Sequence, residues 1–348
     1  QLLEGLIIGI TGSNGKTTTT TLASLMLKES FPEREVYAAG NIGIPLSQLA
    51  EQSTKEDIYV SELSSFQLMG IDQFKPKIAC IVNIFSAHLD YHGTREEYIE
   101  AKLQLTKNQT EDDYLVYNAD YPELMTLIEG HTKATLVPFS RKTVLEFGAC
   151  VEGDYICFNG EKVIPVSTIQ VPGTQNVENV LAAVAIAKLA GATNEGIQKA
   201  VQNFHGVKHR TQFVKEVNKR RFYNDSKATN PVATTTALSG FEKNIILVCG
   251  GKDRGIDFKE LVPFFQRIKA MVVVGESKEI LYNLAVDNKV ECHRAVKVDD
   301  ATILANTLAA DGDTILLSPA CASWDQYKCF EDRGDEFIAT FEKISQED

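Results

Sequence analysis

The chain has 348 residues, of which 44% are hydrophobic and 24% charged. This balance is typical of a globular protein large enough for more than one core, and it excludes a disordered, collagen-like or disulfide-framed chain. Lys and Arg number 35 against 47 Asp and Glu, a net charge of −12 that argues against a general binder of nucleic-acid phosphates.

The cysteines and the hydropathy pattern indicate the cellular compartment of the protein. There are seven cysteines, an odd number, and no two have C-x-x-C spacing, which is typical of thiols in a reducing environment. No apolar run reaches the roughly 18 residues of a membrane span, and no basic segment followed by an apolar one opens the chain. We therefore expect a cytoplasmic protein with neither membrane nor nucleic-acid partners.

From Gly5 to about Phe204, short apolar runs alternate with helical stretches, as in a parallel sheet covered on both faces. The expected strands are Leu6–Ile10, Asp57–Glu62, Ile78–Asn83 and Leu115–Asn118, and the clearest helices are Thr17–Lys28 and Thr94–Asn108. Turn signals between Val137 and Val171 predict a small antiparallel subsheet, and a helix should follow from Asn176 to about Ala190.

A second alternating region begins after Gly206, so we expect one domain over 1–206 and another over 207–348. Alternating charges predict a solvated hairpin over Lys215–Arg221. The expected strands are Arg221–Asn224, Ile245–Cys249, Ala270–Val274 and Thr314–Ser318.

A glycine loop lies between the first expected strand and the first expected helix, and it is the strongest chemical signal in the chain. Its backbone N–H groups and the helix N-terminus would bind phosphates, with Lys16 on the β- and γ-phosphates and the Thr17 hydroxyl on Mg²⁺. An ordinary glycine turn is the alternative. The residues that we assign to ATP here are Gly12, Ser13, Asn14, Gly15, Lys16, Thr17 and Thr18.

Further motifs follow in chain order. They are E-L-S-S-F-Q-L from Glu62, N-I-F-S-A-H-L-D from Asn83, Y-I-E-A-K-L from Tyr98, G-T-Q-N-V-E-N from Gly173, His209-Arg210, N-D-S-K-A-T-N from Asn224 and L-S-P-A-C-A-S from Leu317. Together with T-G-S-N-G-K-T at the glycine loop, this series resembles the central and C-terminal domains of the Mur ligases. E-L-S-S-F-Q-L resembles the branch of that family that adds D-glutamate.

The resemblance implies a fold and a reaction. The fold would be a P-loop parallel-sheet ATPase domain with a small antiparallel subsheet, followed by a Rossmann-like α/β domain that binds D-glutamate. ATP would phosphorylate the terminal carboxylate of UDP-N-acetylmuramoyl-L-alanine, and the amine of D-glutamate would displace phosphate to form an amide. The chain is expected to act as a monomer and to lack the family's N-terminal UDP-binding domain.

The resemblance also assigns catalytic and metal-binding roles. Lys16, Glu62, His88 and Lys102 would be catalytic, and Thr17, Glu62, His88 and Lys102 would serve two Mg²⁺ sites, with Lys102 carbamylated by CO₂. From residue types alone, Glu62 could be a helix-capping carboxylate, His88 a core histidine and Lys102 a solvated side chain.

The remaining assignments concern the nucleotide and the substrates. Asn176 and Asn179, three apart and so on one helix face, would contact adenine, unless they are a helix cap and a surface amide. Arg210 would contact phosphate and Asp225 ribose, although the segment from Asp225 could be a plain turn. The substrate-binding assignments are Asn41, Lys227, Thr229, Arg254, Ser323 and Phe330, with Lys252 as an alternative to Arg254 for the glutamate carboxylate.

Two other functions stay open at this point. One is a ligase of the folylpolyglutamate synthetase type, which also adds glutamate. The other is an ATP-binding fragment without turnover, because loss of the remote binding energy of a UDP-binding domain would impair catalysis as well as affinity.

Overall fold

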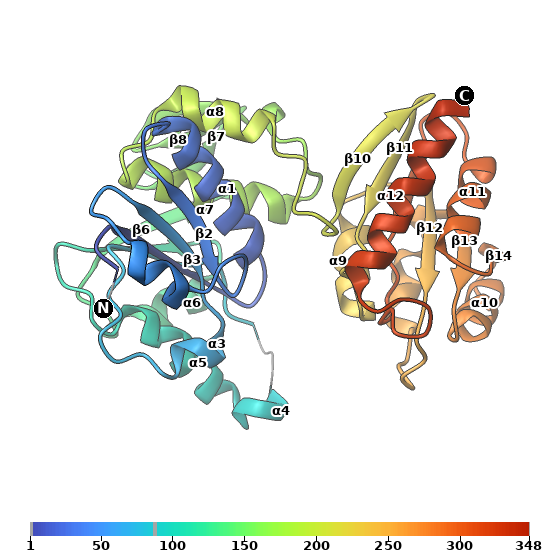
Figure 1. Cartoon of the computed structure of the whole chain (residues 1–348), viewed down its shortest axis with the longest axis horizontal. Helices are drawn as coiled ribbons and strands as arrows, with labels where there is room; N and C mark the ends of the chain where they lie inside the picture. The colour runs from blue at the N-terminus through green and yellow to red at the C-terminus, as the bar shows by residue number, and fades with distance from the viewer. Residues whose placement is uncertain (1–2, 86–88, 348) are drawn as a thin grey trace. The chain divides into compact units, whose positions relative to one another are not determined.

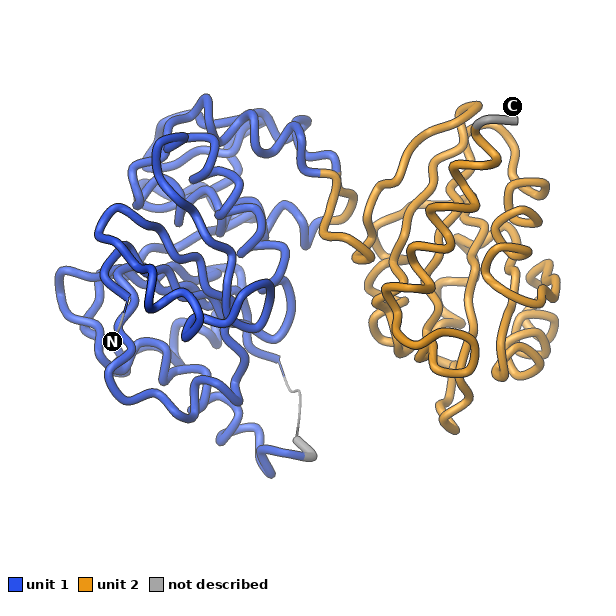
Figure 2. Tube along the Cα trace, in the orientation of Figure 1, with its two compact units in different colours: residues 1–170, 174–204 blue, residues 171–173, 205–348 orange. Residues whose placement is uncertain are grey.

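The computed structural model describes residues 3–347 except 86–88, and it divides into two compact units. The first comprises Gln1–Gln170 and Thr174–Phe204, and the second Val171–Gly173 and His205–Asp348 (Figure 2). Each unit has a β-sheet of its own with helices packed on it (Figure 1).

The sheet of the first unit has nine strands in the order β2-β3-β1-β4-β5-β6-β7-β8-β9. Pairing is parallel from β2 to β7 and antiparallel from β7 to β9. The predicted antiparallel strands are therefore present but continue the main sheet, because β7 pairs directly with β6. The strands are β1 Leu6–Thr11, β2 Val36–Gly40, β3 Ile58–Glu62, β4 Ile78–Ile81, β5 Tyr114–Asn118, β6 Thr135–Ser140, β7 Ala149–Glu152, β8 Tyr155–Phe158 and β9 Glu161–Pro165.

The long helix α7 is the central helix of this unit. All eight residues from Val180 to Ala187 are buried, and the helix packs against β4 to β8. The predicted helix over Thr94–Asn108 is shorter, since Thr94 is its N-cap and α5 ends at Leu103 before a 3-10 turn. The helices are α1 Lys16–Ser30, α2 Leu46–Leu49, α3 Ser65–Leu68, α4 Leu89–His92, α5 Arg95–Leu103, α6 Pro122–Ile128, α7 Thr174–Leu189 and α8 Asn194–Gln202.

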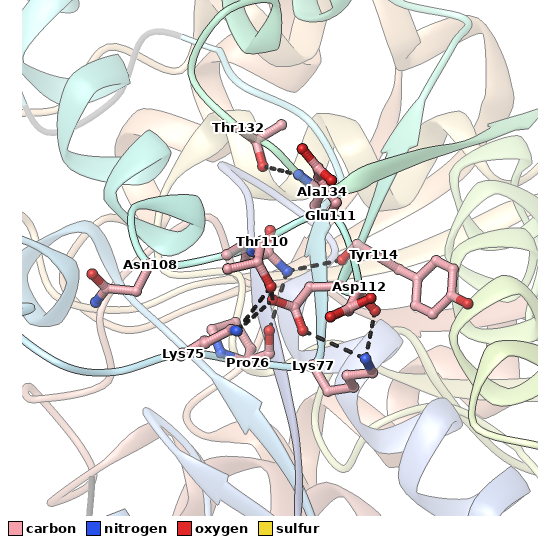
Figure 3. A network of polar contacts seen from close by, with 12 residues as sticks. Lys75, Pro76, Lys77, Asn108, Thr110, Glu111, Asp112, Tyr114, Thr132 and Ala134 are labelled. Atoms are coloured by element: carbon pink, nitrogen blue, oxygen red, sulfur yellow. Dashed lines mark hydrogen bonds and ion pairs between the residues drawn. The ribbon is translucent and has the colours of Figure 1, made fainter.

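A polar network closes the amino-terminal edge of this sheet, where β4 and β5 begin (Figure 3). The buried Asp113 accepts the backbone N–H of Thr110 at 2.8 Å and forms an ion pair with Lys75 at 3.0 Å. Lys77 lies 3.6 Å from the other carboxylate oxygen. These charges therefore neutralise one another at this edge.

The second unit has a six-stranded sheet in the order β10-β11-β15-β12-β13-β14, parallel except for β10. The predicted hairpin is confirmed: β10 and β11 are joined by Asn218 and Lys219, which have φ of 49° and 60° as a tight primed turn requires. The strands are β10 Gln212–Val217, β11 Arg220–Asn224, β12 Ile245–Gly250, β13 Ile268–Val274, β14 Glu291–Arg294 and β15 Thr314–Leu317.

Two buried clusters cover the faces of this second sheet, one including Leu247 and Met271 and the other Val248 and Phe337. The neighbouring residues of β12 alternate between the clusters, as expected for a strand buried on both faces. The helices are α9 Pro231–Ser239, α10 Lys278–Asp287, α11 Val298–Leu308 and α12 Phe330–Glu347, with a 3-10 helix over Lys259–Arg267. Within the described ranges of both units, no helix is long and apolar enough to cross a membrane.

Candidate active site

The glycine loop connects β1 to α1 and has the local structure of a phosphate-binding loop. Gly15 is the N-cap of α1, with φ of 81°, and among the described residues no side chain caps the helix. A Cβ at Gly15 would lie 2.3 Å from the Asn179 amide oxygen, so glycine is required by both space and backbone conformation. The first N–H groups of a four-turn helix are therefore available to an anion.

Lys16 folds back over the loop. Its Nζ donates to the carbonyl oxygens of Gly12 and Ser13 at 2.8 and 3.0 Å. The ammonium group thus lies over the loop that would bind the phosphates. Thr17 and Thr18 follow in the first turn of α1, and Thr17 is buried.

Asn83 and Tyr98, to which the sequence analysis gave no role, support the glycine loop. The Asn83 side chain accepts the N–H of Asn14 at 2.9 Å and donates to the Asn14 carbonyl at 3.2 Å. The hydroxyls of Ser13 and Tyr98 are 2.9 Å apart. Both supports belong to motifs recognised in the sequence, but their partnership with the loop depends on contacts across 69 and 85 residues.

Glu62 ends β3, which pairs with β1 so that Ile10 and Glu62 are register partners. One carboxylate oxygen accepts the Asn41 side-chain amide at 2.8 Å. The other is buried and has no hydrogen-bond partner within the described part of the chain. A buried carboxylate oxygen without a donor fits a cation ligand, and Mg²⁺ prefers such oxygens.

The side chain of Lys102, on α5, extends to the glycine loop. It is 1% exposed, and its Nζ donates to the Gly12 carbonyl at 2.9 Å and lies 4.7 Å from the centre of the Tyr98 ring. Burial lowers its pKa from 10.5 to about 7, helped by Lys16 and opposed by Glu62. At neutral pH the neutral amine is therefore far more accessible than in an ordinary lysine, which is almost wholly protonated.

The two histidines of this region differ. His88 lies outside the described residues. His92 is buried on α4, 2.9 Å from the Ser65 hydroxyl and stacked on Phe66.

The asparagine pair on α7 lies against α1. Asn179 donates to the Asn176 amide oxygen at 3.2 Å and accepts from the Thr19 hydroxyl at 3.4 Å. Both amides are buried. These hydrogen bonds fix both amides next to the phosphate loop, within the same unit as Gly15.

In the second unit, the candidate residues lie on loops that follow the adjacent strands β11, β15 and β12. The carboxyl ends of neighbouring parallel strands share one edge, where ligands bind in open α/β sheets. Asp225 follows β11 and accepts the Ser318 hydroxyl at 2.7 Å and the Thr211 N–H at 3.0 Å. Burial raises the pKa of Asp225 to about 7, against these hydrogen bonds and the nearby Arg210. The Asp225 carboxylate therefore braces the segment that carries Arg210.

Arg333, on α12, joins two of these loops and was not anticipated from the sequence. Its guanidinium donates to the Ser226 hydroxyl at 3.0 Å, the Ser226 carbonyl at 2.7 Å and the Cys321 carbonyl at 3.0 Å. The side chain is fully buried, and burial lowers its pKa to about 10. In the sequence, the one signal for a role of Arg333 at the site is its position three residues after Phe330.

The predicted amino-acid pocket residues are distributed over the same loops. Lys227 Nζ lies 5.2 Å from the centre of the Phe330 ring, and Thr229 is half-buried just before α9. The Ser323 hydroxyl is buried without a hydrogen-bond partner among the described residues. Such an orphaned hydroxyl fits a ligand acceptor or donor.

The two candidate cations on the loop after β12 have different partners. Lys252 forms an ion pair with Glu276 at 2.8 Å, whereas the Arg254 guanidinium lies 5.7 Å from the centre of the Trp324 ring. Lys252 already has a carboxylate partner, so Arg254 has the more available charge.

Comparison with known proteins agrees with this architecture. The family model "Mur ligase middle domain" matches residues 10–187, and "Mur ligase, glutamate ligase domain" matches residues 209–321. Since these matches cover most of the chain, it belongs to the Mur ligase family, whose members are ATP-dependent ligases.

Curated relatives and solved structures extend this result. The UDP-N-acetylmuramoylalanine--D-glutamate ligase of Latilactobacillus sakei is 52% identical over 348 residues, which are 99% of this chain and 76% of that protein. The protein of the same name from Halalkalibacterium halodurans is 49% identical over 347 residues, with the same coverage. A MurF structure from Acinetobacter baumannii aligns with a TM-score of 0.73 at 18% identity, covering 97% of this chain and 77% of that one. The ADP complex of MurF from Thermotoga maritima aligns at 0.67 and 19%, covering 99% and 81%.

Proposed function

We propose that this chain ligates D-glutamate to UDP-N-acetylmuramoyl-L-alanine at the expense of ATP, in the synthesis of peptidoglycan precursors. The observation that carries the proposal is the grouping of Lys16, the unsatisfied Glu62 oxygen and the buried Lys102 amine around one phosphate loop. The names of the relatives at about 50% identity supply the two substrates.

Phosphoryl transfer to a carboxylate brings two anions together, so the chain's task is to position and neutralise charge. Lys16 and the N-terminus of α1 would hold the β- and γ-phosphates. The substrate carboxylate would take the γ-phosphoryl group and release ADP. The free amine of D-glutamate would then attack the acyl carbon, and the resulting tetrahedral adduct would expel phosphate and lose a proton to give the amide.

The residues at the loop fit Mg²⁺. Thr17 and Glu62 would hold one ion, and His88 with Lys102 would serve a second. When bound, Mg²⁺ neutralises the charge that develops on the phosphoryl oxygens. Asn41 holds the other Glu62 oxygen by its hydrogen bond, which orients the carboxylate toward this task.

Carbamylation would make Lys102 a ligand. Its neutral amine would add to CO₂, forming an N–C bond and releasing one proton, and the cation would become an anion with two oxygens. The pKa of about 7 supplies the neutral amine that this step requires. Incubation with ¹³C-bicarbonate should give a carbamate carbon signal that is absent from Lys102→Met, and a free amine in the metal-loaded protein would refute the assignment.

The other assignments divide between the domains 1–206 and 207–348. Asn176 and Asn179 would contact the adenine. Arg210 would contact phosphate, and Asp225 would bind ribose. D-glutamate would bind Lys227, Thr229, Arg254, Ser323 and Phe330, since a dicarboxylate needs cations and several hydroxyl or N–H donors. All seven cysteines are free, which is consistent with a cytoplasmic enzyme, and we expect a monomer that binds no membrane.

The test is phosphate release with ATP, UDP-N-acetylmuramoyl-L-alanine and D-glutamate. We expect release that depends on both substrates, is absent with L-glutamate, and is lost in Glu62→Gln. Release with a folate plus L-glutamate instead would favour the folylpolyglutamate-type reaction. ATP binding without release under either condition would favour a fragment without turnover.

A further inference from the structure

Trp324 is the one tryptophan of the chain, and its surroundings are unusual for so large a side chain. It is 66% exposed and follows Ser323, whose own hydroxyl is buried without a partner in the described part of the molecule. An isolated exposed aromatic residue needs no explanation, but one beside an unsatisfied buried hydroxyl on a ligand-binding edge does.

The backbone that carries Trp324 is firmly held. The Ser323 carbonyl accepts the N–H groups of Gln326 and Tyr327 at 3.1 and 2.8 Å. Asp325 accepts the N–H of Glu276 at 3.1 Å. These hydrogen bonds fix the backbone around Trp324, and this fixed backbone leaves the indole exposed to solvent.

The loop that carries Arg254 runs beside this segment. The Lys252 N–H donates to the Ala322 carbonyl at 2.9 Å, which joins the two loops two residues before Arg254 and two before Trp324. The Arg254 guanidinium then lies 5.7 Å from the centre of the indole ring. Within the described residues, the Trp324 ring is the partner of the Arg254 guanidinium. The tip of the loop is also held by a hydrogen bond from the Gly255 N–H to the Asp253 side chain at 2.9 Å.

We propose that Trp324 is a positioning residue for the amino-acid substrate, holding the Arg254 guanidinium at the sheet edge whose loops carry Arg254 and Ser323, to receive one carboxylate of a dicarboxylic amino acid. This inference rests on the proposed function for the identity of that amino acid. An exposed arginine side chain at a loop tip would lose conformational freedom when it binds a carboxylate. Contact with the indole face orders the side chain beforehand, so less of the binding energy is lost on ordering.

The kinetic test compares Trp324→Leu, which removes the aromatic face, with Trp324→Phe, which keeps a weaker one. Tyr282→Leu is the matched control, because Arg294 lies 3.3 Å from the Tyr282 ring centre in the same unit, and neither residue of this pair has an assigned substrate role. We expect Trp324→Leu to raise the KM for D-glutamate about two- to fivefold, the range of an exposed cation–π contact, with kcat and the KM for ATP unchanged. Trp324→Phe should recover part of the loss, and Tyr282→Leu should change none of these constants.

A double-mutant cycle separates positioning from a general structural effect. In the Arg254→Met background, Trp324→Leu should raise the KM no further. An equal effect of Trp324→Leu with and without Arg254, or a wild-type KM in Trp324→Leu, would overturn the inference.

The single tryptophan gives a second readout that needs no turnover. D-glutamate should change the emission of Trp324 in the unaltered chain and leave that of Arg254→Met nearly constant. If the unaltered chain releases no phosphate with D-glutamate, the proposed function fails and this titration decides the inference alone. Constant emission at saturating D-glutamate would then refute it.

Discussion

The buried Lys102 amine should make the protein less stable at neutral pH, although the proposed reaction requires it. Its pKa falls from 10.5 in the unfolded chain to about 7 in the folded one. A fall of roughly 3.5, at about 1.4 kcal/mol for each unit of pKa, corresponds to about 5 kcal/mol of lost stability below pH 7.

The sign of the pH dependence follows from proton binding. Between pH 7 and 10.5 the unfolded state binds more protons at this lysine than the folded state does. The free energy of unfolding should therefore rise with pH across that window. Lys102→Met removes the titrating group and should stabilise the first unit at pH 6.5 by about 2 to 5 kcal/mol, the lower figure allowing for the lost hydrogen bond to Gly12.

The assay is hydrogen exchange of the amides in β1 and α5 from pH 6.5 to 10, in CO₂-free buffer. Fluorescence is unsuitable, because the one tryptophan lies in the second unit. The stabilisation should shrink as pH rises and vanish near pH 10.5, while ligase activity is lost throughout. A variant less stable than the wild type at pH 6.5, or a difference independent of pH, would refute the reasoning.

Three further outcomes are expected. Gly15→Ala should weaken ADP binding at least tenfold by calorimetry, because its Cβ would meet the Asn179 amide oxygen at 2.3 Å on a backbone with φ of 81°; undiminished affinity would contradict this. Arg333→Met leaves three buried acceptors without donors and should destabilise the second unit by about 3 to 5 kcal/mol in urea unfolding followed by tryptophan emission. Burial raises the pKa of the Asp113 carboxyl, but its hydrogen bonds and the nearby Lys75 lower that pKa by more, so the net pKa lies below its ordinary value. The stabilisation from the ionised Asp113 is therefore present above about pH 4 and lost as pH falls through the lowered pKa. Asp113→Asn should cost about 1 to 2 kcal/mol at pH 7, and thermal unfolding should show this cost shrinking as pH falls through that pKa.

Much of the fold could be read from local pattern. Parallel strands buried on both faces are continuous apolar runs, so the strands containing Ile8, Val60 and Val248 were found within one or two residues of their ends. Tertiary contacts decided what local pattern left open. The predicted antiparallel strands are present, and the pairing of β7 with β6 makes them continue the main sheet. The predicted helix over Thr94–Asn108 was too long, because α5 ends at Leu103.

The candidate site divides in the same way. The phosphate-binding chemistry of the glycine loop follows from residue type and spacing. The roles of Glu62 and of the loop after β11, and the ligase family, were nominated by the resemblance of contiguous motifs to that family. The sequence could not show that Asn83 and Tyr98 support the loop, or that Arg333 joins Ser226 to Cys321, because each partnership spans a long stretch of chain.

Composition alone suggested only an acidic globular protein of more than one core. Residue spacing added the strand–loop–helix order, and the resemblance of the motifs to a known family added the family. The lowered pKa of Lys102, the Glu62 oxygen without a partner among the described residues and the pairing of Arg254 with Trp324 were decided by the tertiary structure. The physical reason is that burial and charge proximity depend on distances in space. The same lysine is a solvated cation on an exposed helix and an amine of lowered pKa next to a phosphate loop.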